Sequence, residues 1–440
     1  MGAQLKIGLQ TWGSEGDVQP FIALAAGLVQ AGHVVTLVVT DNEGRDYSKY
    51  SDQFGFTLIN VFNTDVLNIE EESPEVMEQL WQKMVGTRNL ITQTEMILSF
   101  GFDPVMEKIF AAAKELCANN DLVVGHFFLY PLRAAAEKSA TPVVTINLVH
   151  SLQPSVHLCP GGFPDLGRWS YPLAWKIVRV ILNRIFLPRV NALRLRENLL
   201  PNTDVIQQSW VSDRLNLIAV SPSLFQAPPD WNGTHSVCGF LNLPKGLPQA
   251  ISPAGLDEFI AVGAAPVYFC FGSMMIHNLN YLQQTVAIWN EAVKRVGCRA
   301  IFQLPWDDLS VFDCGKNVFK LQRSTHQTIF PRCALIVHHG GSGTTQASLR
   351  AGRPSVVVAH IADQFFWGAE LQRLGVAGPK LIRKRLSAKR LAACITTSLA
   401  SPEMAARAVA IGQAMAQENG VDVAVKLLEA CVSLPSATRD

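Results

Sequence analysis

A glycine-rich segment with histidine and hydroxyl side chains, VHHGGSGTT at 337–345, has the composition of an anion-binding turn. It follows an apolar run at 334–337, expected to be a buried strand, and precedes a helical pattern at 346–351. Glycine removes Cβ atoms that would keep a phosphate from the main chain, and the first turn of a helix presents N–H groups to an anion. The segment is therefore a candidate diphosphate site, although glycine-rich turns also arise for purely conformational reasons.

Composition limits the classes of protein that this chain can be. Its 440 residues, 48% hydrophobic and 17% charged, are enough for two domains with large cores. The 37 basic and 36 acidic residues nearly cancel, so we expect no nucleic-acid partner. The nine cysteines form neither a CxxC pair nor a zinc-like cluster, which predicts reduced thiols in a cytoplasmic protein. No apolar run reaches the ~18 residues that a membrane-spanning helix needs.

Alternating strand and helix patterns must position the glycine-rich segment. Strands are predicted at 5–10, 34–40, 121–125, 142–147 and 215–220, with helices at 21–30, 74–99, 104–118 and 132–139. A second pattern has strands at 267–271, 300–304, 334–337 and 355–359, with helices at 279–296, 364–374, 387–399, 402–417 and 422–434. Such βαβ repeats predict parallel sheets with right-handed crossovers.

The stretch between the two patterns, 222–253, is rich in proline and glycine and is predicted to be an interdomain linker. The sequence thus predicts an α/β protein with two facing Rossmann-like domains and a cleft between them. Ligands in open α/β sheets bind beyond the carboxyl ends of the strands, where the glycine motifs lie.

Four short stretches carry a family resemblance. They are GSEGDVQP at 13–20, FGSM at 271–274, FPRCALIVHHGGSGTT at 330–345 and ADQFFW at 362–367. In this order they resemble the family 1 nucleotide-sugar-dependent glycosyltransferases, which include sterol and flavonoid glucosyltransferases, antibiotic glycosyltransferases and rhamnosyltransferases. The resemblance implies the GT-B fold, inversion at the anomeric carbon, and no metal ion or other cofactor. It also implies acceptor binding mainly by residues 1–240, nucleotide-sugar binding mainly by 241–420, and a C-terminal helix at 421–440 that returns to the first domain.

The resemblance assigns the donor site residue by residue. The donor diphosphate is expected to contact Ser273, His339, Gly341, Ser342, Gly343 and Thr344, and the sugar hydroxyls to contact Asp363 and Gln364. The nucleobase region is expected at Gln322, Ser324 and His326. Two purely structural alternatives stand beside these roles: Ser273 in a strand-end turn, and Asp363 as a helix N-cap. Plant relatives carry a tryptophan under the nucleobase where this chain has Leu-Gln-Arg at 321–323, so UDP and dTDP both stay open.

An inverting transfer needs a base for the acceptor hydroxyl. The resemblance places it at Asp17, after the first strand, where plant relatives have a histidine backed by an aspartate after a later strand. In this chain the two residue types are exchanged, so we expect His126, after the strand at 121–125, to pair with Asp17. A carboxylate at its usual pKa of about 3.9 is a weak base, so we expect either desolvation of Asp17 or transfer of the proton to a histidine with a pKa near 6.5. The alternatives are that Asp17 caps a helix beginning near Val18 and that His126 is a core histidine bonded to a carbonyl.

A basic and apolar segment at 171–198 interrupts the α/β pattern. Pro188 is expected to divide it into two short helices. One interpretation lays residues 171–196 on an anionic membrane surface as a peripheral contact. The other uses the segment to wall the acceptor pocket, with its apolar side inward and its arginines in water. Both interpretations favour an apolar acceptor such as a sterol, polyketide, flavonoid or lipid.

The leading hypothesis is therefore a metal-independent, inverting glycosyltransferase that moves a hexose from a UDP- or dTDP-sugar to a hydroxyl of a small apolar molecule. A sugar-nucleotide epimerase on the same fold would turn over the donor without an acceptor. A non-catalytic nucleotide-sugar binding module would keep His339 and the glycines but not the base. A dehydrogenase has less support still, because neither glycine-rich turn spells GxGxxG with an acidic residue about twenty positions on.

Overall fold

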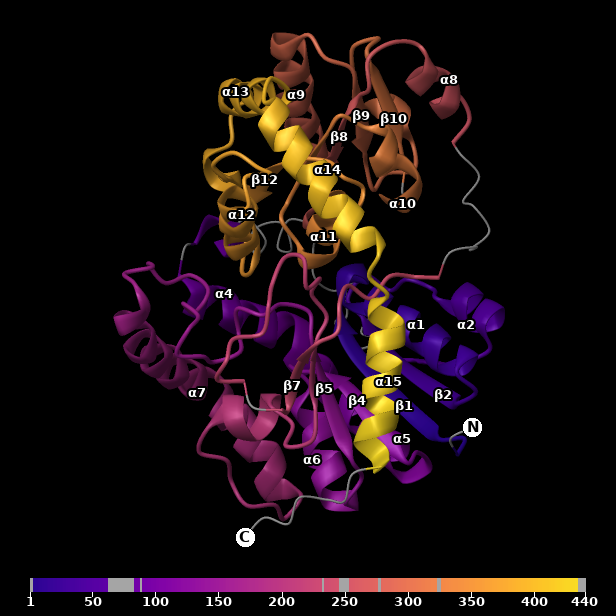
Figure 1. Cartoon of the computed structure of the whole chain (residues 1–440), viewed down its shortest axis with the longest axis vertical. Coiled ribbons are helices and arrows are strands. Elements are labelled where there is room, and N and C mark those ends of the chain that lie inside the picture. Colours follow the sequence, from indigo (N-terminus) through magenta and orange to yellow (C-terminus); the bar gives the residue numbers. More distant parts are fainter. Residues whose placement is uncertain are drawn as a thin grey trace. The chain divides into compact units, whose positions relative to one another are not determined.

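The computed structural model of the chain (Figure 1) describes residues 3–61, 83–87, 89–231, 233–244, 253–275, 278–322 and 326–433. They divide into two compact α/β units. The first takes the described parts of 1–72, 89–245 and 418–440, and the second takes those of 73–88 and 246–417. Each unit carries a parallel sheet, which confirms the predicted fold class of two Rossmann-like domains. The cleft expected between them stays a prediction.

The first unit is built on a seven-stranded sheet of parallel strands. Its strands are β1 (Lys6–Gly13), β2 (Val34–Asp41), β3 (Thr57–Asn60), β4 (Leu122–His126), β5 (Val143–Asn147), β6 (Asn216–Ile218) and β7 (His235–Val237). They lie in the order β3-β2-β1-β4-β5-β6-β7. The central strands β4 and β5 are buried along their whole length, because helices cover both faces of the sheet.

The helices of the first unit pack on the two faces of this sheet (Figure 1). They are α1 (Glu15–Gln30), α2 (Ser48–Phe54), α4 (Leu90–Met96), α5 (Met106–Asn119), α6 (Tyr130–Ser139), α7 (Tyr171–Arg196) and α15 (Gly420–Ser433), with π-helical turns at Ile97–Phe102 and Ile206–Trp210. Residues of α1 and α15 share one core with Ile7 and Leu9 of β1. Residues of α5, α6 and α7 form the core on the other face.

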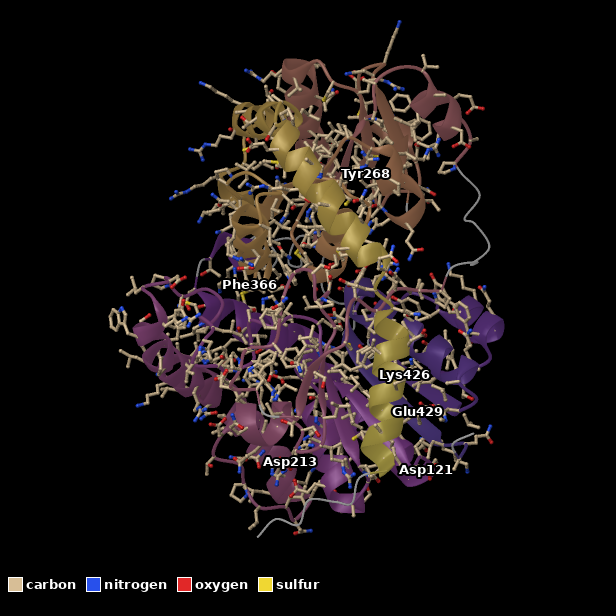
Figure 2. The ribbon with its side chains drawn as sticks, in the orientation of Figure 1. Asp121, Asp213, Tyr268, Phe366, Lys426 and Glu429 are labelled. Carbon is tan, nitrogen blue, oxygen red and sulfur yellow. The ribbon has the colours of Figure 1, made fainter. Side chains whose placement is uncertain are left out.

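The second unit has a six-stranded sheet of the same kind. Its strands are β8 (Val267–Cys270), β9 (Ala300–Gln303), β10 (Val318–Leu321), β11 (Leu335–His338), β12 (Ser355–Ala359) and β13 (Leu381–Ile382), in the order β10-β9-β8-β11-β12-β13. Its helices are α8 (Leu256–Ala261), α9 (Leu279–Val296), α10 (His326–Ile329), α11 (Ser342–Arg350), α12 (Gln364–Arg373), α13 (Ala388–Leu399) and α14 (Pro402–Ala416). Figure 2 shows Tyr268 inside this unit, on the buried strand β8.

Two helices begin earlier than the apolar spacing predicts. Helix α1 starts at Glu15 rather than Phe21, and α11 starts at Ser342 rather than Gln346. Their first turns consist of polar residues and glycine, so hydrophobic periodicity does not register them. As a result, Asp17 and the residues from Ser342 onward lie in the first turn of a helix rather than in a loop ahead of one.

The strands that the sequence analysis missed are short and mostly half-exposed. They are β3, β7, β10 and β13, with two to four residues each. The stretch predicted to be a linker contains one of them, because His235 to Val237 add to the edge of the first sheet beside β6. Residues 83–87 also differ from the expected division of the chain, because they belong to the second unit and not to the first. There Lys384 Nζ donates to the Gly86 carbonyl at 2.9 Å.

Helix α7 corrects two expectations. It runs unbroken from Tyr171 to Arg196 with Pro188 inside it, so the division into two short helices is wrong. Two of its arginines, Arg189 and Arg194, do not lie in water. Arg194 is buried and makes a two-pronged ion pair with Glu137, at 2.8 and 2.9 Å. Arg189 bonds to Asp103 and Glu95.

The C-terminal helix α15 packs against α1 in the first unit (Figure 1). Glu429, visible on this helix beside Lys426 in Figure 2, lies 3.1 Å from Nε2 of His33. His33 also accepts a hydrogen bond from the Leu5 amide. His33 therefore has a structural role at the junction of α1 and β2.

Candidate active site

The turn between β1 and α1 presents Asp17 as the third residue of the helix. Oδ2 of Asp17 accepts hydrogen bonds from the Ser14 amide at 2.8 Å and from the Ser14 hydroxyl at 3.0 Å. The carboxylate therefore caps α1 as the structural alternative predicted, although the helix begins at Glu15 rather than near Val18. Gly13 has φ of +138°, and a Cβ there would lie 2.3 Å from Oδ2 of Asp17. Only glycine fits beneath the carboxylate.

Asp17 has the electrostatic properties of a base. Burial raises its pKa to about 6; the two hydrogen bonds from Ser14 oppose this shift, and the charges of Asp41 and Glu43 add to it. The side chain keeps 33% of its surface exposed, so a hydroxyl group can reach it. The carboxylate is thus ionised at neutral pH but accepts a proton more readily than an ordinary aspartate.

His126 ends β4, the strand next to β1. Its Nε2 lies 3.9 Å from Oδ1 of Asp17, which is too long for a hydrogen bond. Burial lowers the pKa of His126 to about 3, so the imidazole is neutral. Its Nδ1 is buried without a hydrogen-bond partner among the described residues, so the expected alternative of a carbonyl-bonded core histidine is not seen there. The structure brings the predicted pair together, and the low pKa of His126 favours desolvation of Asp17 over transfer of the proton to the histidine.

Sequence reasoning missed Asp41. It ends β2 directly opposite Gly13 in the parallel register, and it is 7% exposed. It accepts a hydrogen bond from the Arg45 amide at 2.7 Å, and burial raises its pKa. Its sequence signal is an acidic residue at the carboxyl end of the strand that neighbours β1. Its negative charge helps to keep the pKa of Asp17 high.

The glycine-rich turn joins β11 to α11 and leaves the start of that helix without a side-chain cap. Gly341 occupies the N-cap position, and Ser342 is the first helical residue. The first amides of a helix have no intrahelical acceptor, and they form the positive end of its dipole. The amides of Gly343 and Thr344 are therefore placed to bind an anion.

The three glycines of this turn have different surroundings. A Cβ at Gly340, where φ is +91°, would lie 2.8 Å from Val357, and one at Gly341 would lie 2.4 Å from Nε2 of His339. A Cβ at Gly343 would meet nothing within 4 Å. Internal packing therefore already requires glycine at 340 and 341, whereas Gly343 borders open space. The expectation that all three glycines make room for a phosphate stays a prediction.

His339 lies against the turn that contains Ser273. A Cβ at Gly272, where φ is +52°, would be 2.9 Å from Cε1 of His339, because β8 and β11 are neighbours. Burial, with a smaller contribution from His326, lowers the pKa of His339 to about 3, so its imidazole is a neutral donor. Its Nδ1 is buried without a partner in the described chain. The adjacent His338 is fully buried and accepts from the Gly340 amide at 3.1 Å.

Asp363 and Gln364 follow β12 and join this edge of the sheet. Asp363 occupies the N-cap position of α12, as the structural alternative predicted, although its side chain makes no capping hydrogen bond. Gln364 is 5% exposed, and its Oε1 accepts from the amides of His360 and Ile361 at 2.8 and 3.2 Å. The side-chain oxygen that was expected to bind sugar is therefore committed to its own loop. The amide group remains for donation. Figure 2 shows Phe366, which follows in the first turn of α12.

The predicted nucleobase residues lie beyond β10, at the same edge. Gln322 donates from Nε2 to the carbonyls of Trp306 and Asp307 at 3.2 and 3.0 Å. The imidazole of His326 stacks on Phe330, with ring centroids 4.3 Å apart. Ser324 lies outside the described residues. The carboxyl ends of β8, β10, β11 and β12 thus carry the candidate donor residues that the structure describes.

Several features bear on metal and membrane binding. In the described ranges, His, Cys, Asp and Glu side chains nowhere gather in a group of three that would hold a metal ion. All nine cysteines are free, which confirms the expected thiols. Among the described helices, none combines the length and apolar character needed to cross a bilayer.

Comparison with known proteins identifies the family. Residues 7–145 match the Glycosyltransferase family 28 N-terminal domain, and residues 310–430 match the Erythromycin biosynthesis protein CIII-like, C-terminal domain. Over 455 residues the chain is 30% identical to the O-mycaminosyltylonolide 6-deoxyallosyltransferase of Streptomyces fradiae, with 97% of each chain covered. The chain belongs to this family of glycosyltransferases. The family resemblance stated from four sequence stretches is confirmed.

This glycosyltransferase is also similar to a sterol enzyme and to solved glycosyltransferases. It is 28% identical over 446 residues to a sterol 3-beta-glucosyltransferase of Saccharomyces cerevisiae, with 96% of the chain but only 35% of the yeast protein covered. Its fold matches the solved glycosyltransferase of kitacinnamycin, at 19% identity and a TM-score of 0.67, with 97% and 99% of the two chains covered. It also matches VinC, solved in complex with dTDP, at 18% identity and a TM-score of 0.62, over 97% and 99%. These likenesses confirm the GT-B fold.

Proposed function

We propose that this glycosyltransferase moves a hexose from a UDP- or dTDP-sugar to a hydroxyl group of a small apolar acceptor, with inversion and without a metal ion or other cofactor. The observation that carries the proposal is Asp17, an accessible carboxylate whose pKa is raised to about 6 at the carboxyl end of β1. Such a group takes the proton of an attacking hydroxyl at neutral pH.

The reaction is a single displacement. The acceptor hydroxyl gives its proton to Asp17 while its oxygen attacks the anomeric carbon from the side opposite the diphosphate. The bond between that carbon and the diphosphate oxygen breaks, and the nucleotide leaves with the electron pair. Ser14 orients Asp17 through two hydrogen bonds, and His126, neutral and 3.9 Å from the carboxylate, does not receive the proton.

Donor binding falls to the second unit. The amides of Gly343 and Thr344 at the uncapped start of α11 face the negative charge that grows on the leaving diphosphate. Ser342, neutral His339 and Ser273 add side-chain donors. Asp363 and the Gln364 amide contact the sugar, and the turn at Gln322, Ser324 and His326 contacts the nucleobase. Preorganised donors of this kind stabilise the leaving group without a metal.

The relatives support an apolar acceptor. One is named for a tylonolide acceptor and another for a sterol, which are both bulky and largely apolar molecules. Several solved neighbours contain thymidine diphosphate, whereas the sterol enzymes are named as glucosyltransferases. We therefore keep UDP-glucose and dTDP-hexoses as the donors to test first.

The test is a matrix of UDP- and dTDP-sugars against sterols and macrolide aglycones, with released nucleotide as the readout and EDTA in parallel. We expect nucleotide release only with both substrates, no loss with EDTA, and a product whose anomeric NMR coupling shows inversion. Donor conversion without an acceptor would instead indicate an epimerase. Tight nucleotide-sugar binding with no turnover on any acceptor would indicate a binding module.

A further inference from the structure

The first half of α7 carries an apolar stripe on its solvent side. Trp169, in the short turn before the helix, is 76% exposed, and Leu173, Ile177 and Val180 are 59%, 44% and 68% exposed. Their spacing of three to four residues places them on one side of the helix. Leu166, 59% exposed, precedes them in the chain. Within the described chain, nothing covers this stripe.

The stripe is not the face that holds α7 to the protein. The opposite side contributes Ile185, Phe186, Val190 and Leu193 to the core of the first unit. Helix α7 lies at the periphery of that unit, beyond β7 (Figure 1). Helix α7 is thus apolar on two sides: one side packs into the core, and the other faces outward.

The charges of α7 are also divided between two groups. The helix has six basic residues and no acidic one. Four of them form ion pairs inside the unit: Arg179 with Asp204, Arg189 with Asp103 and Glu95, Arg194 with Glu137, and Arg196 with Glu107. The others, Lys176 and Arg184, are exposed beside the apolar stripe, as is Arg168 just before the helix. For these three the described residues provide no acidic partner.

We propose that this face, made of Trp169, Leu173, Ile177 and Val180 with Arg168, Lys176 and Arg184, docks on the surface of an anionic lipid bilayer. The apolar side chains enter the boundary between headgroups and acyl chains, and the three cations lie at the lipid phosphates. An exposed tryptophan favours that boundary, because its ring is apolar and its N–H stays hydrated.

Charge decides between a bilayer and a second copy of the chain. In a two-fold contact between copies, the same patch lies on both sides, so unpaired cations would oppose unpaired cations. An anionic membrane instead offers a negative charge to each of them. Docking of this kind requires no spanning helix, and it does not depend on which donor or acceptor the enzyme uses.

The test is cosedimentation of the full chain with vesicles of phosphatidylglycerol and phosphatidylcholine, compared with vesicles of phosphatidylcholine alone. We expect binding to the anionic vesicles that weakens as salt is added. The variant Lys176→Gln/Arg184→Gln should lower the partition coefficient about fivefold for each cation removed. Leu173→Ser/Val180→Ser should lower it by about tenfold or more.

Matched controls come from the second unit. Val262 is 75% exposed and Lys316 is exposed, so Val262→Ser and Lys316→Gln change similar chemistry elsewhere and should bind as the wild type does. Thermal unfolding of each variant shows whether it is folded. As a second readout, the emission of Trp169, taken as the difference between wild type and Trp169→Phe, should shift to the blue on anionic vesicles.

Three results would overturn the proposal. One is absence of binding to anionic vesicles at low salt. Another is equal loss of binding in the control variants and the α7 variants. The third is a wild-type dimer in sedimentation velocity that Leu173→Ser/Val180→Ser converts to monomer, since this face would then join copies of the chain.

Discussion

The turn after β1 and the turn after β11 share a layout and differ in how the helix start is satisfied. Each joins a buried parallel strand to a helix whose second residue is glycine, Gly16 in α1 and Gly343 in α11. In α1 the third residue, Asp17, bonds back to the Ser14 amide ahead of the helix. In α11 the third residue is Thr344, and the N-cap is a glycine. The first turn carries its own anion, and the second is left to receive one from a ligand.

The comparison teaches that a helix N-terminus does not by itself decide the chemistry of a turn. The positive end of α1 and the Ser14 hydrogen bonds both favour the ionised form of Asp17. Burial and the nearby charges of Asp41 and Glu43 outweigh them, and the pKa rises to about 6. The residue at the third helical position and its surroundings separate a base from an anion site.

The largest expected effect is the loss of the base. Asp17→Asn keeps a side-chain oxygen for the Ser14 amide but removes the proton acceptor, so kcat should fall about 1000-fold, within the range for general-base catalysis. Measured between pH 5 and 7, the wild-type rate should fall as Asp17 protonates below about pH 6. The residual rate of the variant should be flat over that range. Near-full turnover by Asp17→Asn would mean that the base lies elsewhere.

The second prediction places a carboxylate at the third position of α11, where α1 has Asp17. Thr344→Asp places a carboxylate at the third helical position, where it would both cap the helix and repel the diphosphate. We expect donor affinity to fall about 100-fold or more, since opposed like charges cost several kcal/mol. Thr344→Asn, which is neutral and of the same shape as Asp, should lose about tenfold. Donor binding by calorimetry separates the two, and equal losses would mean that the diphosphate does not lie at this helix start.

The third prediction uses the glycines of the first turn. Gly13→Ala would drive a methyl group into the Asp17 carboxylate, whereas a Cβ at Gly16 meets only Ser14 Oγ at 3.6 Å. Displacement of the carboxylate should lower kcat about 100-fold, as misplacement by an ångström does elsewhere. Gly16→Ala should leave the unfolding temperature unchanged or raise it, because alanine favours helix over glycine by about 1 kcal/mol. Equal kcat values for the two variants would contradict the close fit beneath Asp17.

The smallest effect is on stability and follows from the sign of the pKa shift. The folded state raises the pKa of Asp17 from an ordinary 3.8 to about 6, so protonation of this group favours folding. Its stabilising contribution is complete below pH about 3.8 and is lost as the pH rises through about 6. Asp17→Asn should therefore unfold at a higher temperature than the wild type at pH 7, and the difference should shrink toward pH 4. If the excess in the unfolding temperature of Asp17→Asn over the wild type grew as the pH fell, the ionised form of Asp17 would be the stabilising one.

Periodicity and spacing were enough for the two α/β units, and the four motif stretches were enough for the family and most candidate site residues. Asp17 and His126 are predictable as neighbours because each follows a strand, and β1 and β4 pair in register. Asp41 was missed because the register of β1 against β2, which sets Asp41 opposite Gly13, cannot be read from the spacing of residues along the chain. Pro188 was misjudged because local propensity is overridden by packing on both sides of that residue, at Phe186 and Val190.

The sequence by itself determined where chemistry can occur, since residue types and their positions after strands are local properties. Only the tertiary structure decided what each group does there. Hydration, neighbouring charge and open space depend on atoms distant in the chain. They make Asp17 the stronger base and His126 a neutral partner. They also leave open space beside Gly343, whereas side chains lie close to Gly340 and Gly341.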